Sequence, residues 1–391
     1  MFAMLAISCG MEWASADDGE TFNLVISQYF QSDDNLYRLP SGVTAPDGKR
    51  SDTIGVTSLT GEFHRRYGRQ RLRGDLGVTH AVYAAHGDLD YTVPRVRLAW
   101  DWQLGNRWSG VFRRDYVETP AGFENTIGTD QLIRERNLTA ASADYWWHPD
   151  WAAGLGASSV RNTYHDDARP SSDSDVDDID LNLTYRPSSG NRVVFTVRDA
   201  DGRYPGRPAL SGSIRDYEQQ DVRTRGEWTL TGAMRVAGDI GYTWRSYDLA
   251  PNRDFDGITG RMLVHWQPTY KTALELSWRR EIGAEEDVVA NYAVTSALVF
   301  APSWRVSEKL SLSARLERST RDYGGDPELG VSADEALSRD DRTRRYGLML
   351  DYSPVRAVRL GLGAEHQQRR SDVRLREYDA TTVWVSGRIS F

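Results

Sequence analysis

The chain has 391 residues, of which 39% are hydrophobic, and its mean hydropathy is -0.58. No run of 18 apolar residues occurs, which excludes a transmembrane helix. The 48 basic and 56 acidic residues are well mixed, which argues against a nucleic-acid-binding protein, and a single cysteine cannot form an internal disulfide or a zinc cluster.

The first residues, MFAMLAISCGMEWASADDG, predict a signal peptide. A short apolar run over 2–9 precedes Ala14-Ser15-Ala16, which is a small-x-small cleavage site. No Lys or Arg precedes the apolar run, so we expect the signal peptide, 1–16, to be truncated at its start. The alternative is an ordinary N-terminal strand. Export would leave one mature domain, 17–391.

Apolar and polar residues then alternate from end to end of the chain. One segment places Val96, Leu98 and Trp100 against Arg95 and Arg97. A period of two predicts strands with one apolar and one polar face. We expect about 18 strands, with 16–18 as the range, because strand boundaries slip easily. The expected ranges are 20–30, 53–66, 70–83, 90–103, 107–118, 134–148, 151–164, 177–187, 191–200, 216–230, 233–247, 255–267, 270–282, 288–301, 308–322, 341–353, 357–369 and 376–391.

Short and long connections alternate between these strands. The short ones, such as Leu104-Gly105-Asn106 and His148-Pro149-Asp150, have the size and the residues of hairpin turns. The longer, polar ones include 31–52, 119–133 and 324–340. Strict alternation puts all hairpin turns at one end of the sheet and all longer loops at the other.

Two architectures fit many amphipathic antiparallel strands: a soluble sandwich, barrel or propeller, and a transmembrane barrel. The sequence has no internal repeat of propeller-blade size, and a soluble meander of this length would enclose an oversized core. Aromatic residues also gather beside the hairpin turns, as in a membrane barrel's aromatic girdle. They are Trp102, Trp108, Trp147, Trp151, Tyr185, Trp266, Tyr270 and Tyr352. The predicted fold class is therefore all-β, a single antiparallel up-and-down transmembrane β-barrel integral to the outer membrane of a Gram-negative cell.

The closing segment, TTVWVSGRISF, predicts how such a barrel would close. Val383, Val385, Ile389 and Phe391 should face lipid, while Trp384, Ser386 and Arg388 face the lumen. We expect this strand to pair with the first one, near 22–30, and so leave no free sheet edge. The segment resembles the closing strand of bacterial outer-membrane proteins, and that resemblance implies that the barrel-assembly machinery reads Phe391.

Three stretches resemble one family more narrowly. They are DDNLYRLP (33–40), GRYPGRP (202–208) with DYEQQDV (216–222), and the last hairpin, which begins LDYSPVRAVRLGLGAEHQQRR at Leu350. Together they are similar to the β-barrel porins encoded in exopolysaccharide biosynthesis clusters, the EpsL type. The resemblance implies a role in exporting exopolysaccharide across the outer membrane, with polysaccharide and periplasmic export or synthesis proteins as partners. It supplies no catalytic residues and no cofactor.

The predicted lumen face is rich in arginine with interspersed acids, which would suit an acidic polysaccharide or would form mutually satisfied ion-pair ladders. The candidate lumen-lining residues are Arg95, Arg97, Arg223, Arg225, Glu227, Arg235, Arg245, Arg315 and Arg359. Tyr217, Tyr378 and Trp384 are candidates for stacking on sugar rings. For folding into the lumen, connection 119–133 is the first candidate and 31–52 the second, and the alternative for each is an ordinary outer loop.

No enzyme motif occurs, and no cofactor or metal site is predicted. The acidic stretch 166–180 is a candidate for divalent cations, but it lacks EF-hand spacing, and a solvated loop is favoured. Three functions stay open: an exopolysaccharide conduit, a general or substrate-selective diffusion porin, and a structural or adhesion barrel with a blocked lumen. An inward constriction loop would favour the porin, and a periplasmic docking surface would favour the conduit.

Overall fold

The structure, a computed structural model, describes residues 21–45, 47–124, 131–165, 173–206, 216–247, 254–283, 290–325 and 339–391. The predicted signal peptide, 1–16, lies outside these residues, as do parts of the predicted connections 119–133, 165–177, 201–215, 248–254, 283–287 and 324–340. The strands are β1 (Phe22–Asp33), β2 (Asp52–Tyr67), β3 (Gln70–Tyr83), β4 (Tyr91–Leu104), β5 (Trp108–Pro120), β6 (Ile133–His148), β7 (Trp151–Tyr164), β8 (Ser174–Tyr185), β9 (Arg192–Arg203), β10 (Asp216–Thr231), β11 (Met234–Ser246), β12 (Phe255–Trp266), β13 (Thr272–Gly283), β14 (Ala290–Arg305), β15 (Leu310–Gly325), β16 (Asp340–Val355), β17 (Val358–Ser371) and β18 (Tyr378–Ser390). Two single-turn 3-10 helices, η1 (Gly87–Leu89) and η4 (Arg374–Arg376), lie in long connections.

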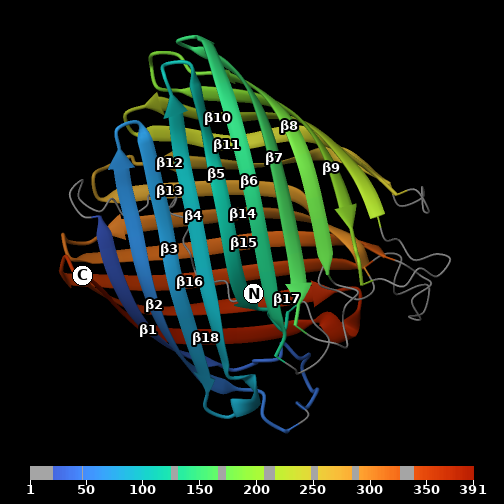
Figure 1. Ribbon diagram of the computed structural model, residues 1–391. Helices are drawn as coiled ribbons and strands as arrows, with labels where there is room; N and C mark the ends of the chain where they lie inside the picture. The colour runs from blue at the N-terminus through green and yellow to red at the C-terminus, as the bar shows by residue number, and fades with distance from the viewer. Residues whose placement is uncertain are drawn as a thin grey trace.

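The strands form one closed 18-stranded antiparallel sheet, in which each strand pairs with the next along the chain (Figure 1). The ring closes between β1 and β18, with Val25 opposite Ser390 and Asp33 opposite Thr382. Beyond them, Leu24 and Phe391 exchange backbone hydrogen bonds of 3.1 and 2.9 Å. The predicted fold class, strand number and closure are confirmed, and closure leaves no unpaired edge.

Short hairpin turns and longer connections alternate around the ring, as the sequence predicts. In Figure 1 the hairpin turns lie toward the upper left and the long connections toward the lower right. Strand β8 begins earlier than expected, at Ser174. The second half of the acidic stretch 166–180 is therefore strand, in which Asp177 and Ile179 face outward and Asp178 pairs with Arg198 on the inner wall. Among the described residues, no helix is long and apolar enough to cross a membrane.

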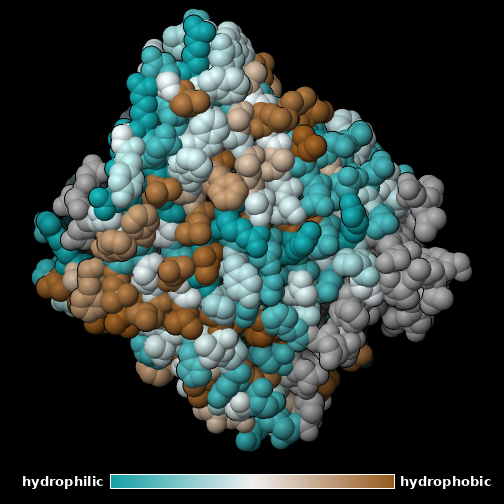
Figure 2. All heavy atoms as spheres, in the orientation of Figure 1, coloured by the Kyte–Doolittle hydropathy of each residue, from teal (hydrophilic) through white to brown (hydrophobic). Residues whose placement is uncertain are grey.

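The two faces of the sheet differ sharply in chemistry. On β16, the lipid-facing candidates Leu348 and Leu350 are 60% and 37% exposed, whereas Asp341, on the other face, is 1% exposed. Directly opposite residues of antiparallel strands point to the same face of the sheet. The pairing register therefore identifies the outward and the inward residues of each neighbouring strand in turn. Figure 2 shows the result as a diagonal hydrophobic band, which crosses the barrel between its two ends.

Aromatic pairs mark the hairpin-turn end of this band. Trp108 packs on Tyr145 with ring centroids 5.0 Å apart, and Trp151 packs on Tyr185 at 4.7 Å. Such rings favour the membrane–water interface, because they present an apolar body and a polar tip. A continuous outer apolar band of this kind would be unstable in water, and it is stable against lipid.

Candidate functional site

Two connections at the long-loop end fold inward and narrow the lumen. The first is Pro120–Glu124, which follows β5. Its base is closed by a hydrogen bond of 2.7 Å from the Ala121 N–H to the Leu132 carbonyl. From there the chain reaches the opposite wall, where the Glu124 carboxylate accepts hydrogen bonds from Arg345 on β16 (3.0 Å) and Gln367 on β17 (3.1 Å). The inward fold of connection 119–133 was the first expectation from the sequence.

Contacts of Glu124 fasten this segment across the lumen. Arg369 of β17 donates a further hydrogen bond to the Glu124 backbone carbonyl. Burial alone would raise the pKa of the Glu124 carboxyl, but the positive charges of Arg345 and Arg321, together with the hydrogen bond from Gln367, lower that pKa below its usual range. The carboxylate is therefore ionised, and the contacts are charge-assisted.

The second inward segment is 34–51, between β1 and β2. Its Leu36, Tyr37 and Ala45 are buried and pack on the inner-wall residues Ile54 and Tyr83. Tyr37 also meets Phe123 of the first segment, with ring centroids 4.9 Å apart in an edge-on arrangement. The two inward segments thus support each other.

Arg38 is held at the inner side of this segment by local contacts. It has a φ of 56°, in the left-handed region that is uncommon for residues other than glycine. Its guanidinium forms two hydrogen bonds with the Asp33 carboxylate, at 2.9 and 2.8 Å, and it also donates to the Asn35 carbonyl. This bidentate pair offsets the backbone strain and fixes where the guanidinium points.

A pocket lies between the first inward segment and the wall formed by β1 and β16–β18. Tyr29 and Trp384 form a stacked pair on one side, with ring centroids 6.4 Å apart and planes 30° from parallel. Gln31 and Gln367 contribute amides to the pocket. The guanidinium groups of Arg38 and Arg345, which are ion-paired with Asp33 and Glu124, also line it. Flat aromatic faces beside amides and charged groups suit a small, ring-shaped polar solute.

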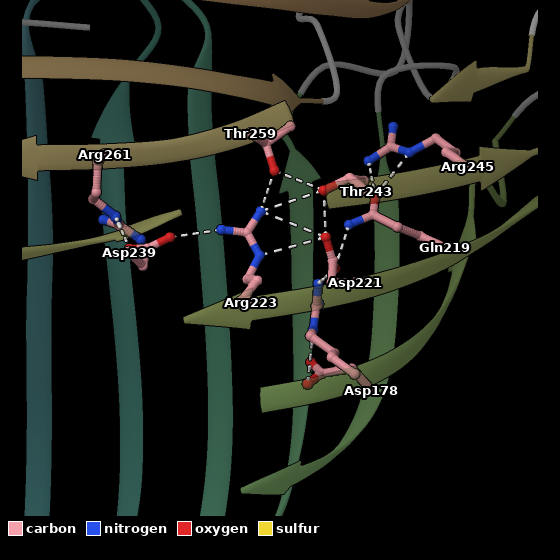
Figure 3. Close-up of polar contacts among 10 residues, drawn as sticks. Asp178, Gln219, Asp221, Arg223, Asp239, Thr243, Arg245, Thr259 and Arg261 are labelled. Atoms are coloured by element: carbon pink, nitrogen blue, oxygen red, sulfur yellow. Dashed lines mark hydrogen bonds and ion pairs between the residues drawn. The ribbon is translucent and has the colours of Figure 1, made fainter. Parts of the chain in front are cut away.

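A second part of the inner wall, over β8 to β12, is a closed polar network (Figure 3). Arg223 pairs with Asp239 at 2.6 Å and with Asp221 at 3.4 Å, and Arg261 also pairs with Asp239. Arg198 joins Asp221 and Asp178, each at 3.1 Å. Arg198, Arg223 and Arg261 are therefore each paired with aspartate, and none of the three is a free anion-binding group, while Arg245 joins the network through Gln219.

All nine lumen-lining residues that the sequence predicts lie at inward-facing positions of their strands. Their surroundings differ. Arg95, Arg223 and Arg315 are ion-paired, Arg95 with Asp75 (2.8 Å) and Arg315 with Glu317 (2.9 Å). Arg97 lies between Asp75 and Asp115 in the pairing register. Nearer the hairpin-turn end, four are exposed: Arg225, Glu227, Arg235 and Arg359. The ninth, Arg245, is buried.

Of the three candidate stacking residues, two have ring faces covered by arginine. Arg245 lies 4.0 Å over the Tyr217 ring and donates to Gln219 Oε1 (2.6 and 2.9 Å), while Arg369 lies 4.7 Å over the Tyr378 ring. Trp384 is the one that lines the pocket. Sugar stacking stays a prediction, and Trp384 is the residue placed to do it.

Sequence reasoning missed the charged groups that define the constriction: Glu124, Arg345 and the pair Arg38–Asp33. Glu124 and Arg345 are far apart in the chain, and no local pattern connects them. Alternation alone could have put Arg345 on the inner face, since it lies one residue from the lipid-facing Tyr346. Within the described ranges, no group of three or more His, Cys, Asp or Glu side chains is arranged to hold a metal ion.

The closed sheet, its outer apolar band and its polar, narrowed interior define an integral β-barrel of the outer membrane. Comparison with known proteins agrees with this class. Residues 230–391 match the family model described as "Putative beta-barrel porin 2". No curated protein matches the chain.

Solved structures share the fold at low sequence identity. OccK2 (OpdF) from Pseudomonas aeruginosa aligns with a TM-score of 0.53 and 13% identity, covering 95% of this chain and 98% of that one. OccK1 (OpdK) from the same organism gives 0.52 and 12%, with the same coverage. A BenF-like porin from Pseudomonas fluorescens Pf-5 gives 0.51 and 11%, again covering 95% and 98%. The descriptions of the family model and of the BenF-like structure name porins, and none of these descriptions mentions exopolysaccharide.

Proposed function

We propose that this protein is a substrate-selective diffusion porin. The observation that carries the proposal is the inward segment Pro120–Glu124, which Glu124 fastens to β16 and β17 across the lumen. A barrel of this strand number leaves an aqueous channel unless something narrows it. The segment supplies a constriction, and the pocket beside it supplies side chains that can discriminate between solutes.

The pocket favours a small, ring-shaped, hydroxylated solute of sugar size. Tyr29 and Trp384 offer aromatic faces, while Gln31, Gln367 and Thr382 offer hydrogen bonds to hydroxyl groups. The charges of Arg38 and Arg345 are already matched by Asp33, Glu124 and Glu317, so a net anion is not required. Among the fold relatives, one structure contains OpdK with vanillate and another OccK2 with glucuronate, both ring-shaped solutes.

Exopolysaccharide export, the function that the sequence resemblance implies, is less well supported. A polymer chain needs an unobstructed bore, and the inward segments occupy part of it. The family model and one of the fold relatives are described as porins.

Single-channel recording in planar bilayers tests the proposal. The purified barrel should open a stable pore without partners, and hexoses or hexuronic acids should block the current transiently. Trp384→Ala should weaken this block, whereas the matched control Trp244→Ala, on the lipid-facing side, should leave it unchanged. A barrel that never conducts would contradict the proposal and favour a blocked structural barrel. Conduction without solute-dependent block would favour a general porin.

A further inference from the structure

Four arginines on the outer face of β15–β17 lie just beyond the apolar band, toward the long-loop end. On β15 the outward column runs through Leu312 and Leu316 to Arg318. On β16 it runs from Leu348 through Tyr346 to Arg344 and then Arg342, and on β17 it reaches Arg370. We call Arg318, Arg342, Arg344 and Arg370 the outer arginine cluster. All four are exposed.

The pairing register sets these charges directly against each other. Arg318 lies opposite Arg344 across β15 and β16, and Arg342 lies opposite Arg370 across β16 and β17. Directly opposite side chains have Cβ atoms about 4.5–5.5 Å apart, and like charges in that position destabilise a sheet. Two such pairs in neighbouring positions therefore need an explanation.

Counter-charges within the chain account for only one of the two pairs. Arg342 forms an ion pair with Asp340 (3.1 Å), and Arg370 forms one with Asp379 (3.2 Å). Among the residues that the structure describes, neither Arg318 nor Arg344 makes an ion pair or a hydrogen bond through its side chain. The cluster thus keeps two uncompensated guanidinium groups on a surface that faces the membrane.

The depth of these groups matches the outer headgroup layer. Arg318 follows Leu310, at the hairpin-turn end, by eight residues, which is about 20 Å along the membrane normal for a strand tilted by about 40°. The apolar band of such barrels is about 25 Å tall, and long arginine side chains extend from its edge to the interface. Tyr346, the outward neighbour below Arg344, is an aromatic residue of the kind found at that boundary.

We propose that the outer arginine cluster binds the phosphate groups of a phosphorylated glycolipid in the outer leaflet. Arginine presents a planar fork that matches phosphate oxygens bidentately, and two forks facing each other can share one phosphate. The leucines below would contact the acyl chains of the same lipid. A bound phosphate would neutralise the charges of Arg318 and Arg344 and so remove the repulsion between them.

The outer face of β8–β10 at the same end differs in charge from this sector. On β8–β10 at the same end, Asp177 lies opposite Asp201, and Asp201 lies opposite Glu218, all on the outer face. Arg203 lies among the acids of that sector, and Asp322, Asp340 and Asp379 lie among the four arginines of the other. Arginines outnumber acids over β15–β17 and acids outnumber arginines over β8–β10, so phosphate is attracted more strongly over β15–β17. The lipid should therefore bind one side of the barrel. This inference requires only that the barrel resides in the outer membrane, and it is independent of what the lumen conducts.

Native mass spectrometry of the intact barrel, with bisphosphorylated lipid A added in detergent, tests the proposal. We expect discrete lipid adducts on the wild type and a loss of affinity on the order of tenfold or more in Arg318→Ala/Arg344→Ala, from the loss of charge-assisted hydrogen bonds. Arg318→Lys/Arg344→Lys keeps the charge but lacks the fork, and its affinity should be intermediate. The matched control is Arg65→Ala, an outward arginine at the opposite end that lies 4.7 Å over the Tyr67 ring.

Two further arms identify the ligand. The affinity of the wild type for dephosphorylated lipid A should be no higher than the affinity of the double variant for bisphosphorylated lipid A, because phosphate is the recognised group. Inorganic phosphate at the same concentration should not displace lipid A, because the leucine contacts add affinity. Equal binding of lipid A by the wild type and the double variant would overturn the proposal, and so would full displacement by inorganic phosphate. Folding of each variant is checked independently by heat-dependent gel mobility.

Discussion

Arginines occur in two contrasting settings in this barrel, on the inner wall of β8–β12 and on the outer face of β15–β17. Inside, Arg198, Arg223 and Arg261 alternate with aspartates, and the network is closed. Outside, Arg318 faces Arg344 with no acid between them. This network satisfies its charges within the chain because Asp221 and Asp239 are buried, whereas Arg225 and Arg235, nearer the hairpin-turn end of the same wall, are exposed. The outer rim can leave charges for its surroundings to match.

The largest expected effect comes from opening the inner network. Asp221 has a fully buried carboxylate that accepts hydrogen bonds from Arg198, Gln219 and Thr243. Asp221→Ala removes the carboxylate that Arg198 and Arg223 share, leaving Arg198 with Asp178 and Arg223 with Asp239, and should lower the free energy of unfolding by about 1.5–3 kcal/mol through the lost charge-assisted hydrogen bonds. Urea unfolding in lipid vesicles, followed by tryptophan fluorescence, measures this. Asp199→Ala, an exposed outward aspartate, should change it by less than about 0.5 kcal/mol. Equal losses in both variants would show that the inner network is not special.

A smaller effect of opposite sign should follow at the outer arginine cluster. In detergent without lipid, Arg344→Ala removes a like-charge repulsion and should leave the unfolding free energy unchanged or raise it by about 0.2–1 kcal/mol. The matched variant Arg342→Ala removes an ion pair with Asp340 and should lower it by no more than about 1 kcal/mol, since that pair is exposed. If Arg344→Ala destabilised the lipid-free barrel strongly, Arg344 would have a structural partner.

The smallest expected effect is the response of the constriction to mild acid. The pKa of Glu124 is depressed in the folded barrel. A depressed pKa means that the stabilisation is fully present above the ordinary glutamate value, about 4.3, and is lost only as pH falls through the lower folded value. Glu124 should therefore stay ionised between pH 7 and about pH 4.5, and it should cause no change in single-channel conductance over that range. A step in conductance within that window, absent from Glu124→Gln, would contradict the depressed pKa.

The sequence predicted the architecture well, because a barrel is built from local rules. Alternation around Val383 and Val385 located the closing strand, and turn residues such as Gly105 located the hairpin end. Apolar alternation also implied which face meets lipid. Closure between β1 and β18 followed from the requirement that a membrane barrel has no free edge.

The constriction and the outer arginine cluster depend on contacts that local patterns do not contain. Glu124 meets Arg345 and Gln367 only because the ring brings β16 and β17 opposite the end of β5. Arg318 and Arg344 oppose each other only in the actual register of β15 and β16. That Arg318 faces outward could be predicted from the sequence, since Arg318 follows the outward Leu316 by two residues. That Arg318 and Arg344 face each other could be predicted only with the register of β15 and β16.

Single-channel conductance of Glu124→Ala tests the central claim, that an inward segment fastened by Glu124 narrows a selective pore. Removing the carboxylate deletes hydrogen bonds from Arg345 and Gln367, each worth about 1.5–3 kcal/mol when a charged group takes part. The segment should detach from β16 and β17, so conductance should rise above the wild-type value and block by sugar-sized solutes should weaken. The control Glu118→Ala, on the outward face of β5, should conduct as the wild type does. Wild-type conductance and undiminished block in Glu124→Ala would contradict the account.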